Sequence, residues 1–179
     1  MTCEIALGPE HSSFERAEFD WRISTARVEE SGPFSQFAGF DRVFVITEGE
    51  GVVLEHGTHA PRSRLRKLEP YKFSGDWPTH CELVRGAVAD FNVLVRRGKF
   101  SAEVMAVQIG SRQMREMTGA GQALVHIQGG AMTARVSGEE QPFELSAGDS
   151  LLLNGLSTHD ELEFTGKSAQ STVILVRIE

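Results

Sequence analysis

Short apolar segments, in which hydrophobic and polar positions alternate, recur along the whole chain. They are rich in Val, Ile, Leu and Phe and are separated by turns containing Gly, Pro, Ser or Asp, a pattern typical of β-strands. No segment carries a sustained helical stripe, and Arg112–Thr118 can form one helical turn at most. The pattern therefore predicts an all-β protein. The predicted strands are Arg22–Val28, Arg42–Thr47, Gly51–Glu55, Cys81–Val84, Asp90–Arg96, Glu103–Ile109, Gln122–Ile127, Ala131–Val136, Ser150–Leu153 and Ser171–Ile178.

The two halves of the chain repeat this pattern. RVFVITEGEGVVLE at 42–55 aligns with ALVHIQGGAMTARV at 123–136, and each contains a strand, a glycine turn and a second strand. Leu68–Asp76 resembles Leu145–Asp149, and Phe91–Arg97 resembles Thr172–Ile178. Two copies of one β-unit indicate a duplicated cupin-like β-barrel, a bicupin, in one compact chain. We expect the first barrel in residues 1–100 and the second, packed on it, in residues 101–179.

Composition and charge narrow the possible partners. The 179 residues include 40% hydrophobic and 24% charged side chains, as in ordinary globular proteins. The net charge of −7 argues against a nucleic-acid partner. The first hundred residues hold 13 basic and 15 acidic groups, and the remainder hold 5 and 10, so an anion finds a site more readily in the first half. Without an apolar run of membrane-spanning length or signal-peptide features, we expect a cytoplasmic protein with no membrane association.

Common catalytic signatures are missing from the sequence. The six histidines form no H-x-H pair, and His56 and His59 lie in a predicted turn. There is no G-x-S-x-G motif, no P-loop and no G-x-G-x-x-G motif, and neither of the two cysteines is placed as an obvious nucleophile. We therefore predict no metal, no cofactor and no catalytic residue.

Polar residues of the first half suggest a binding pocket instead. On the strand Arg22–Val28, alternation places Arg22, Ser24, Ala26 and Val28 on one face and Trp21, Ile23, Thr25 and Arg27 on the other. On Asp90–Arg96, it groups Asp90, Asn92, Leu94 and Arg96 in the same way. Arg, Ser and Asn beside Phe and Trp are suited to holding a carboxylate. The alternative is that Arg42 with Asp41, or Arg96 with Asp90, forms a structural ion pair.

These segments resemble the HutD/Ves family of bacterial proteins. The matching motifs are Trp21-Arg22-Ile23-Ser24, Gly32-Pro33-Phe34-Ser35 with Phe37, Gly39, Asp41 and Arg42, Phe73-Ser74-Gly75, and Asp90-Phe91-Asn92-Val93 with Arg96-Arg97-Gly98. The resemblance implies a bicupin that binds a small carboxylate metabolite in its first barrel, such as urocanate, formylglutamate or formate, and modulates histidine utilisation. Its implied ligand-binding residues are Trp21, Ser24, Ser35, Phe37, Arg42, Phe73, Asp90 and Asn92.

Two other functions remain open at this point. One is a metal-independent cupin enzyme with Asp90 or Asp41 as general base. The other is a protein-interaction module whose first pocket is vestigial and whose acidic second barrel docks a partner. A homodimer is also a possible assembly.

Overall fold

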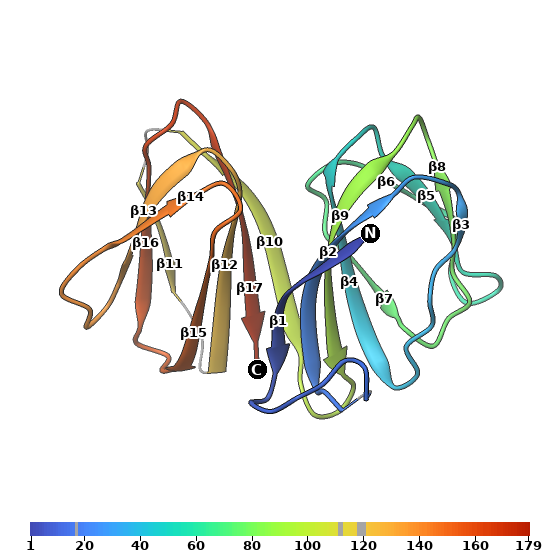
Figure 1. The fold of residues 1–179 in the computed structure, drawn as a ribbon, viewed down its shortest axis with the longest axis horizontal. Helices are drawn as coiled ribbons and strands as arrows, with labels where there is room; N and C mark the ends of the chain where they lie inside the picture. The colour runs from blue at the N-terminus through green and yellow to red at the C-terminus, as the bar shows by residue number, and fades with distance from the viewer. Residues whose placement is uncertain (17, 111–112, 118–120) are drawn as a thin grey trace. The chain divides into compact units, whose positions relative to one another are not determined.

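The computed structural model describes residues 1–16, 18–110, 113–117 and 121–179, and its regular elements are β-strands (Figure 1). The prediction of an all-β protein is confirmed. The chain divides into two compact units, Met1–Ser101 and Ala102–Glu179. No helix in the described part of the chain is long and apolar enough to cross a membrane.

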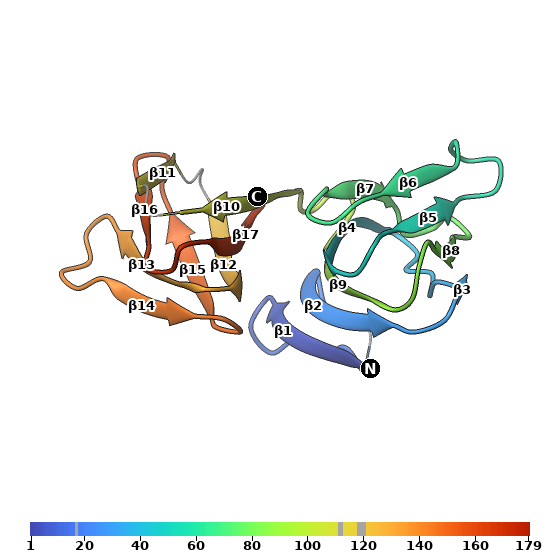
Figure 2. The same cartoon turned by 90° about the horizontal axis from the view of Figure 1, so that it is seen from above.

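The first unit contains two antiparallel sheets with an apolar core. The five-stranded sheet has the order β1-β2-β9-β4-β7, and the four-stranded sheet has the order β3-β8-β5-β6. In Figure 2 each sheet follows one side of the unit. Phe44, Leu54 and Phe73 belong to the core of the unit. The strands are β1 (Thr2–Gly8), β2 (Trp21–Val28), β3 (Gly32–Pro33), β4 (Phe40–Glu48), β5 (Val52–Glu55), β6 (Ser63–Leu65), β7 (Tyr71–Ser74), β8 (His80–Leu83) and β9 (Val88–Arg96).

The second unit also has two four-stranded antiparallel sheets, with the orders β10-β17-β12-β15 and β11-β16-β13-β14. Val125, Met132 and Phe164 are fully buried in its core. The strands are β10 (Ala102–Ile109), β11 (Gln113–Met117), β12 (Gly121–Gly129), β13 (Ala131–Val136), β14 (Phe143–Ser146), β15 (Ser150–Leu156), β16 (Glu161–Gly166) and β17 (Ser171–Ile178).

The two units have the same strand order once β1 is set aside. The order β2-β9-β4-β7 corresponds to β10-β17-β12-β15, and β3-β8-β5-β6 corresponds to β11-β16-β13-β14. The aligned segments 42–55 and 123–136 contain the equivalent hairpins β4–β5 and β12–β13. The aligned pair Leu68–Asp76 and Leu145–Asp149 is shifted, because Gly75-Asp76 follows β7 whereas Gly148-Asp149 precedes the equivalent strand β15. A Gly-Asp dipeptide suits many turns, so this match alone does not identify equivalent positions.

All ten predicted strands are present, some with longer ends. The strands that the sequence pattern missed, β1, β3, β6, β7, β11, β14 and β16, are mostly short or carry few apolar residues. In the region where at most one helical turn was expected, Gln113–Met117 forms strand β11. The ends of that expected turn, residues 112 and 118, lie outside the described residues.

Candidate functional site

Three neighbouring strands of the first unit form the floor of a cavity. Residues in register on adjacent strands project from the same side of a sheet, so the pairing of β2, β9 and β4 arranges their side chains in rows. The rows are Arg22, Leu94 and Arg42; Ser24, Asn92 and Phe44; and Ala26, Asp90 and Ile46. The face of β2 that carries Arg22 and Ser24 is thereby joined to the face of β9 that carries Asp90 and Asn92.

The cavity above this floor has a volume of about 250 Å³. The segment after β3 forms a wall, to which it contributes Phe34, Ser35 and Phe37. The complete lining is Thr2, Arg22, Ser24, Ala26, Arg27, Val28, Pro33, Phe34, Ser35, Phe37, Arg42, Asp90, Asn92 and Leu94.

A chain of hydrogen bonds connects three buried polar side chains on the floor. Arg42 donates from Nε and Nη2 to Oδ1 of Asn92, at 2.8 and 2.5 Å. The amide of Asn92 in turn donates from Nδ2 to Oδ1 of Asp90. Arg42 is 8% exposed and Asp90 is 1% exposed. The guanidinium also lies 4.6 Å from the ring centre of Phe34, so Arg42 is held in one orientation.

Burial changes the pKa values of the two ionisable groups in this hydrogen-bonded set, Asp90 and Arg42. It raises the pKa of Asp90 to about 7, against the opposing effects of Arg42 and Asn92. Burial also lowers the pKa of Arg42 to about 10, so this side chain remains a cation at neutral pH. Near pH 7, Asp90 is only partly ionised. The floor therefore carries the buried positive charge of Arg42, which Asp90 neutralises only in part.

A second arginine lies in the same row, on β2. The guanidinium of Arg22 pairs with Glu4 at 3.0 Å between Nε and Oε2, and it lies 3.9 Å from the ring centre of Phe14. Arg22 is 8% exposed and lines the cavity. The alternation along the strand predicts that it shares a face with Ser24, but Arg22 is not among the predicted binding residues.

Six of the eight predicted binding residues line this cavity: Ser24, Ser35, Phe37, Arg42, Asp90 and Asn92. Trp21 does not, because it lies on the opposite face of β2, where it packs against Gly8. Phe73 does not line it either. Its ring centre lies 5.5 Å from the Arg42 guanidinium, and the residue belongs to the core.

The two structural ion pairs considered as alternatives, Arg42 with Asp41 and Arg96 with Asp90, are replaced by other interactions. Arg42 contacts Asn92 instead of pairing with Asp41, and Arg96 pairs with Asp20 at 2.9 Å instead of Asp90. The alternation along β2 and β9 is the signal that could have identified Arg22 and Leu94 as residues that line the cavity. Phe34 belongs to the motif Gly32-Pro33-Phe34-Ser35, but its approach to Arg42 depends on how the loop folds.

The histidines of this unit do not surround the cavity. His56 is fully buried, with Nδ1 2.9 Å from the Thr79 hydroxyl and Nε2 3.3 Å from the Tyr71 hydroxyl. It also stacks on the Tyr71 ring. Among the described residues, no group of three or more His, Cys, Asp or Glu side chains could hold a metal ion.

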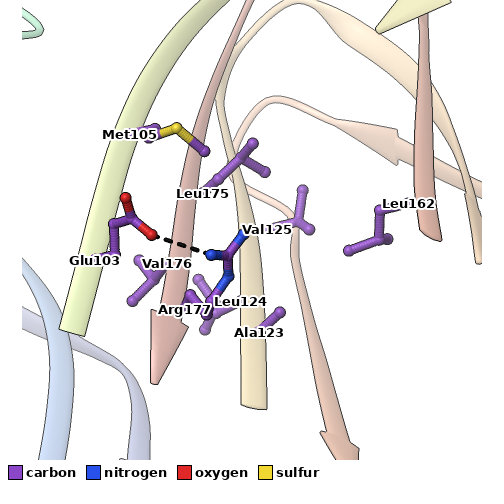
Figure 3. Close-up of a pocket in the computed structure, with 9 residues that line it drawn as sticks. All are labelled: Glu103, Met105, Ala123, Leu124, Val125, Leu162, Leu175, Val176 and Arg177. Atoms are coloured by element: carbon purple, nitrogen blue, oxygen red, sulfur yellow. Dashed lines mark hydrogen bonds and ion pairs between the residues drawn. The ribbon is translucent and has the colours of Figure 1, made fainter. Parts of the chain in front are cut away.

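The second unit contains a different kind of cavity, shown in Figure 3. Its volume is about 20 Å³, close to that of one water molecule, and most of its lining is aliphatic. Arg177 and Glu103 form an ion pair at 3.1 Å beside it. The small volume and apolar lining do not suit a polar metabolite, whereas the cavity lined by Arg42, Asp90 and Asn92 combines polar and charged side chains and is the candidate site.

Comparisons with known proteins place the chain among bacterial relatives. It is 37% identical over 87 residues to an uncharacterised 21.2 kDa protein in the hutC 3′ region of Pseudomonas putida, covering 48% of this chain and 45% of that protein. It is 36% identical over 88 residues to protein Ves of Citrobacter koseri, covering 49% and 46%. These alignments therefore span less than half the length of each curated relative.

Two solved structures resemble nearly the whole chain. A conserved protein of unknown function from Pseudomonas aeruginosa PAO1 has a TM-score of 0.88 at 30% identity, covering 99% of this chain and 90% of that one. HutD from Pseudomonas fluorescens SBW25, in a formate condition, has a TM-score of 0.74 at 28% identity, covering 99% and 88%.

Solved structures of lower sequence identity resemble this chain in fold alone. A cupin 2 conserved barrel domain protein from Leptotrichia buccalis has a TM-score of 0.58 at 13% identity, covering 100% of this chain and 88% of that protein. The sheets described above are thus those of a cupin-like barrel protein. The HutD family model matches residues 1–173, and the chain belongs to the HutD family.

Proposed function

We propose that the cavity of the first unit binds a small carboxylate metabolite, and that the protein modulates histidine utilisation through this ligand. The observation that carries the proposal is the buried Arg42 cation. Asn92 accepts from its Nε and Nη2 atoms, and no acceptor for Nη1 lies among the described residues. A ligand carboxylate can accept from the remaining guanidinium donors and complete the charge balance that Asp90 supplies only in part.

The relatives support the choice of ligand class. HutD of Pseudomonas fluorescens was solved in a formate condition, and the Pseudomonas putida relative is a protein in a hut gene region. We therefore propose urocanate, formylglutamate and formate as the candidate ligands, each of which offers at least one carboxylate to Arg42.

The position of Arg22 ranks these candidates. Arg22 and Arg42 lie in one row on β2 and β4, which both neighbour β9, so their backbones are about 10 Å apart at the usual strand spacing. Both side chains line the cavity between them. A ligand with two carboxylates can reach both arginines, whereas one with a single carboxylate reaches one. We therefore propose that formylglutamate binds more tightly than urocanate or formate.

Isothermal titration and thermal unfolding with formate, urocanate, formylglutamate and glutamate test the proposal. A bound ligand stabilises the folded protein by about 2.7 kcal/mol when it is present at a hundred times its Kd. Arg42→Gln should abolish the effect. The control is Arg62→Gln, because Arg62 is an arginine of the same unit that pairs with Glu55 and Glu82 and does not line the cavity. No heat and no stabilisation with any of these compounds at millimolar concentration would refute the proposal.

A metal-independent enzyme is the second candidate, and one observation favours it. Asp90 combines a position on the cavity floor with a pKa of about 7, which suits a group that both accepts and donates a proton near neutral pH. Urocanate and formylglutamate can be incubated with the protein and followed by NMR. Turnover that disappears in Asp90→Asn would establish this activity, and its absence with both compounds would count against it.

A further inference from the structure

One wall of the cavity is an irregular loop. Residues Phe34–Gly39 connect β3 to β4, and Phe34, Ser35 and Phe37 of this loop line the cavity. Such a loop lacks the continuous ladder that holds a strand in position. The bonds that order it therefore decide how well the wall is formed.

Hydrogen bonds join the loop to the turn that follows β7. The backbone N–H of Phe37 donates to the carbonyl of Gly75 at 2.8 Å, and the N–H of Gly75 donates to the carbonyl of Phe40 at 2.8 Å. The approach is so close that a Cβ on Gly75 would lie 2.6 Å from the Phe37 carbonyl oxygen. The carboxylate of Asp76 adds a third bond, because its Oδ1 accepts from the N–H of Gly39 at 2.7 Å.

Arg97 connects these parts with every nitrogen of its guanidinium. Nε donates to Asp41 at 2.8 Å, and Nη1 donates to Asp76 at 2.6 Å. Nη2 donates both to the carbonyl of Phe40 and to the hydroxyl of Ser74, at 2.9 and 2.6 Å. The planar fork of arginine suits this arrangement, in which one side chain binds the first residues of β4 and the turn after β7 together.

The charges of this group reinforce each other. The pKa of Asp76 is lowered to about 2, because the N–H of Gly39, the Arg97 guanidinium and the Ser74 hydroxyl all donate to its carboxylate. The side chains of Arg97 and Asp76 are 44% and 41% exposed. Pairs at such exposure contribute little to global stability, so their removal should affect local order more than folding. Neither residue lines the cavity.

We propose that Arg97 and Asp76 are positioning residues, which hold the loop Phe34–Gly39 against β4 and β7 and thereby set the affinity of the cavity for its ligand. The part of this inference that concerns affinity rests on the proposed function. The loop must be ordered for its side chains to meet a ligand, so the apparent Kd rises in inverse proportion to the ordered fraction.

Hydrogen exchange and ligand binding measured on the same variants test the proposal. In Arg97→Gln and Asp76→Ala, the amides of Phe37 and Gly39 should exchange about tenfold faster or more. The Kd for formylglutamate or urocanate should rise about tenfold if the ordered fraction falls to a tenth. Arg97→Lys keeps the charge but not the fork, so it should not restore either value. Arg62→Gln, which removes another exposed double ion pair, should leave both unchanged.

Each outcome of this experiment decides the proposal. Unchanged exchange in Arg97→Gln and Asp76→Ala would overturn the role of Arg97 and Asp76 in ordering the loop, and faster exchange with unchanged Kd would overturn their effect on affinity. If the wild-type protein binds neither compound, the proposed function fails, whereas the exchange data still decide whether Arg97 and Asp76 order the loop. If Arg97→Gln does not fold, Ser74→Ala removes one of the four contacts and should show a smaller increase in exchange of the same two amides.

Discussion

The carboxyl group of Asp90 should make the first unit less stable as the pH rises through neutrality. Burial raises its pKa to about 7 in the folded protein, whereas an unfolded chain has a value of about 3.9. Between these two values the folded state holds a proton that the unfolded state has released. The free energy of unfolding therefore falls with increasing pH across this window.

The difference between the folded and unfolded pKa values of Asp90 determines how much the free energy of unfolding changes. The folded state loses about 3 kcal/mol between pH 5 and pH 8, and about 4 kcal/mol over the whole window, at about 1.4 kcal/mol per pKa unit. Asp90→Asn cannot ionise, and its amide oxygen can still accept from Asn92. The variant should therefore be more stable than wild type at pH 8 and should lose most of this advantage by pH 5.

Urea unfolding followed by tryptophan fluorescence provides the measurement. The two tryptophans, Trp21 and Trp77, both lie in the first unit, so their emission reports on that unit. Subtracting the wild-type curve from the Asp90→Asn curve removes the contributions of other titrating groups. Glu144→Gln, in the second unit, serves as a control that should parallel wild type. Parallel curves for wild type and Asp90→Asn between pH 5 and pH 8 would refute the reasoning.

Three further predictions concern other parts of the molecule. Arg42→Ala should abolish carboxylate binding in titration calorimetry but cost only about 1–3 kcal/mol of stability in urea, because Asn92 loses a partner while the cavity admits water. His56, whose pKa is lowered mainly by burial, should destabilise the first unit as the pH falls below about 6.5, and NMR titration should show that its ring charges below that value. Phe164→Ala should destabilise the second unit by about 3–5 kcal/mol in calorimetry, because the ring is fully buried in its core. Carboxylate binding by Arg42→Ala would contradict the first prediction, and a His56 pKa that is not lowered would contradict the second. A melting curve of Phe164→Ala that matches wild type would contradict the third.

The sequence by itself determined the features that depend on local periodicity. Alternation along β2 and β9 grouped Arg22 with Ser24 and Asp90 with Asn92 correctly, because side chains two residues apart in a strand share a face. The repeated strand–turn–strand pattern indicated two similar units, because it too can be read from neighbouring residues. The equal strand orders of the two units agree with it. Short strands such as β3 and β6 escaped detection, since two or three residues do not establish a period.

Only the tertiary structure decided which of these faces meet and what each side chain contacts. Arg42 binds Asn92, 50 residues further along the chain, because β4 and β9 are neighbours in the sheet and their register places Arg42 opposite Leu94, two residues from Asn92. The pairing of β2 with β9 brought Arg22 to the cavity and left Trp21 on the far face of β2, whereas Phe73, on β7, belongs to the core. The raised pKa of Asp90 likewise results from burial, a property of the folded unit. Local pattern thus specifies the orientation of neighbouring residues, while contacts, burial and charge arise from segments that are distant in sequence.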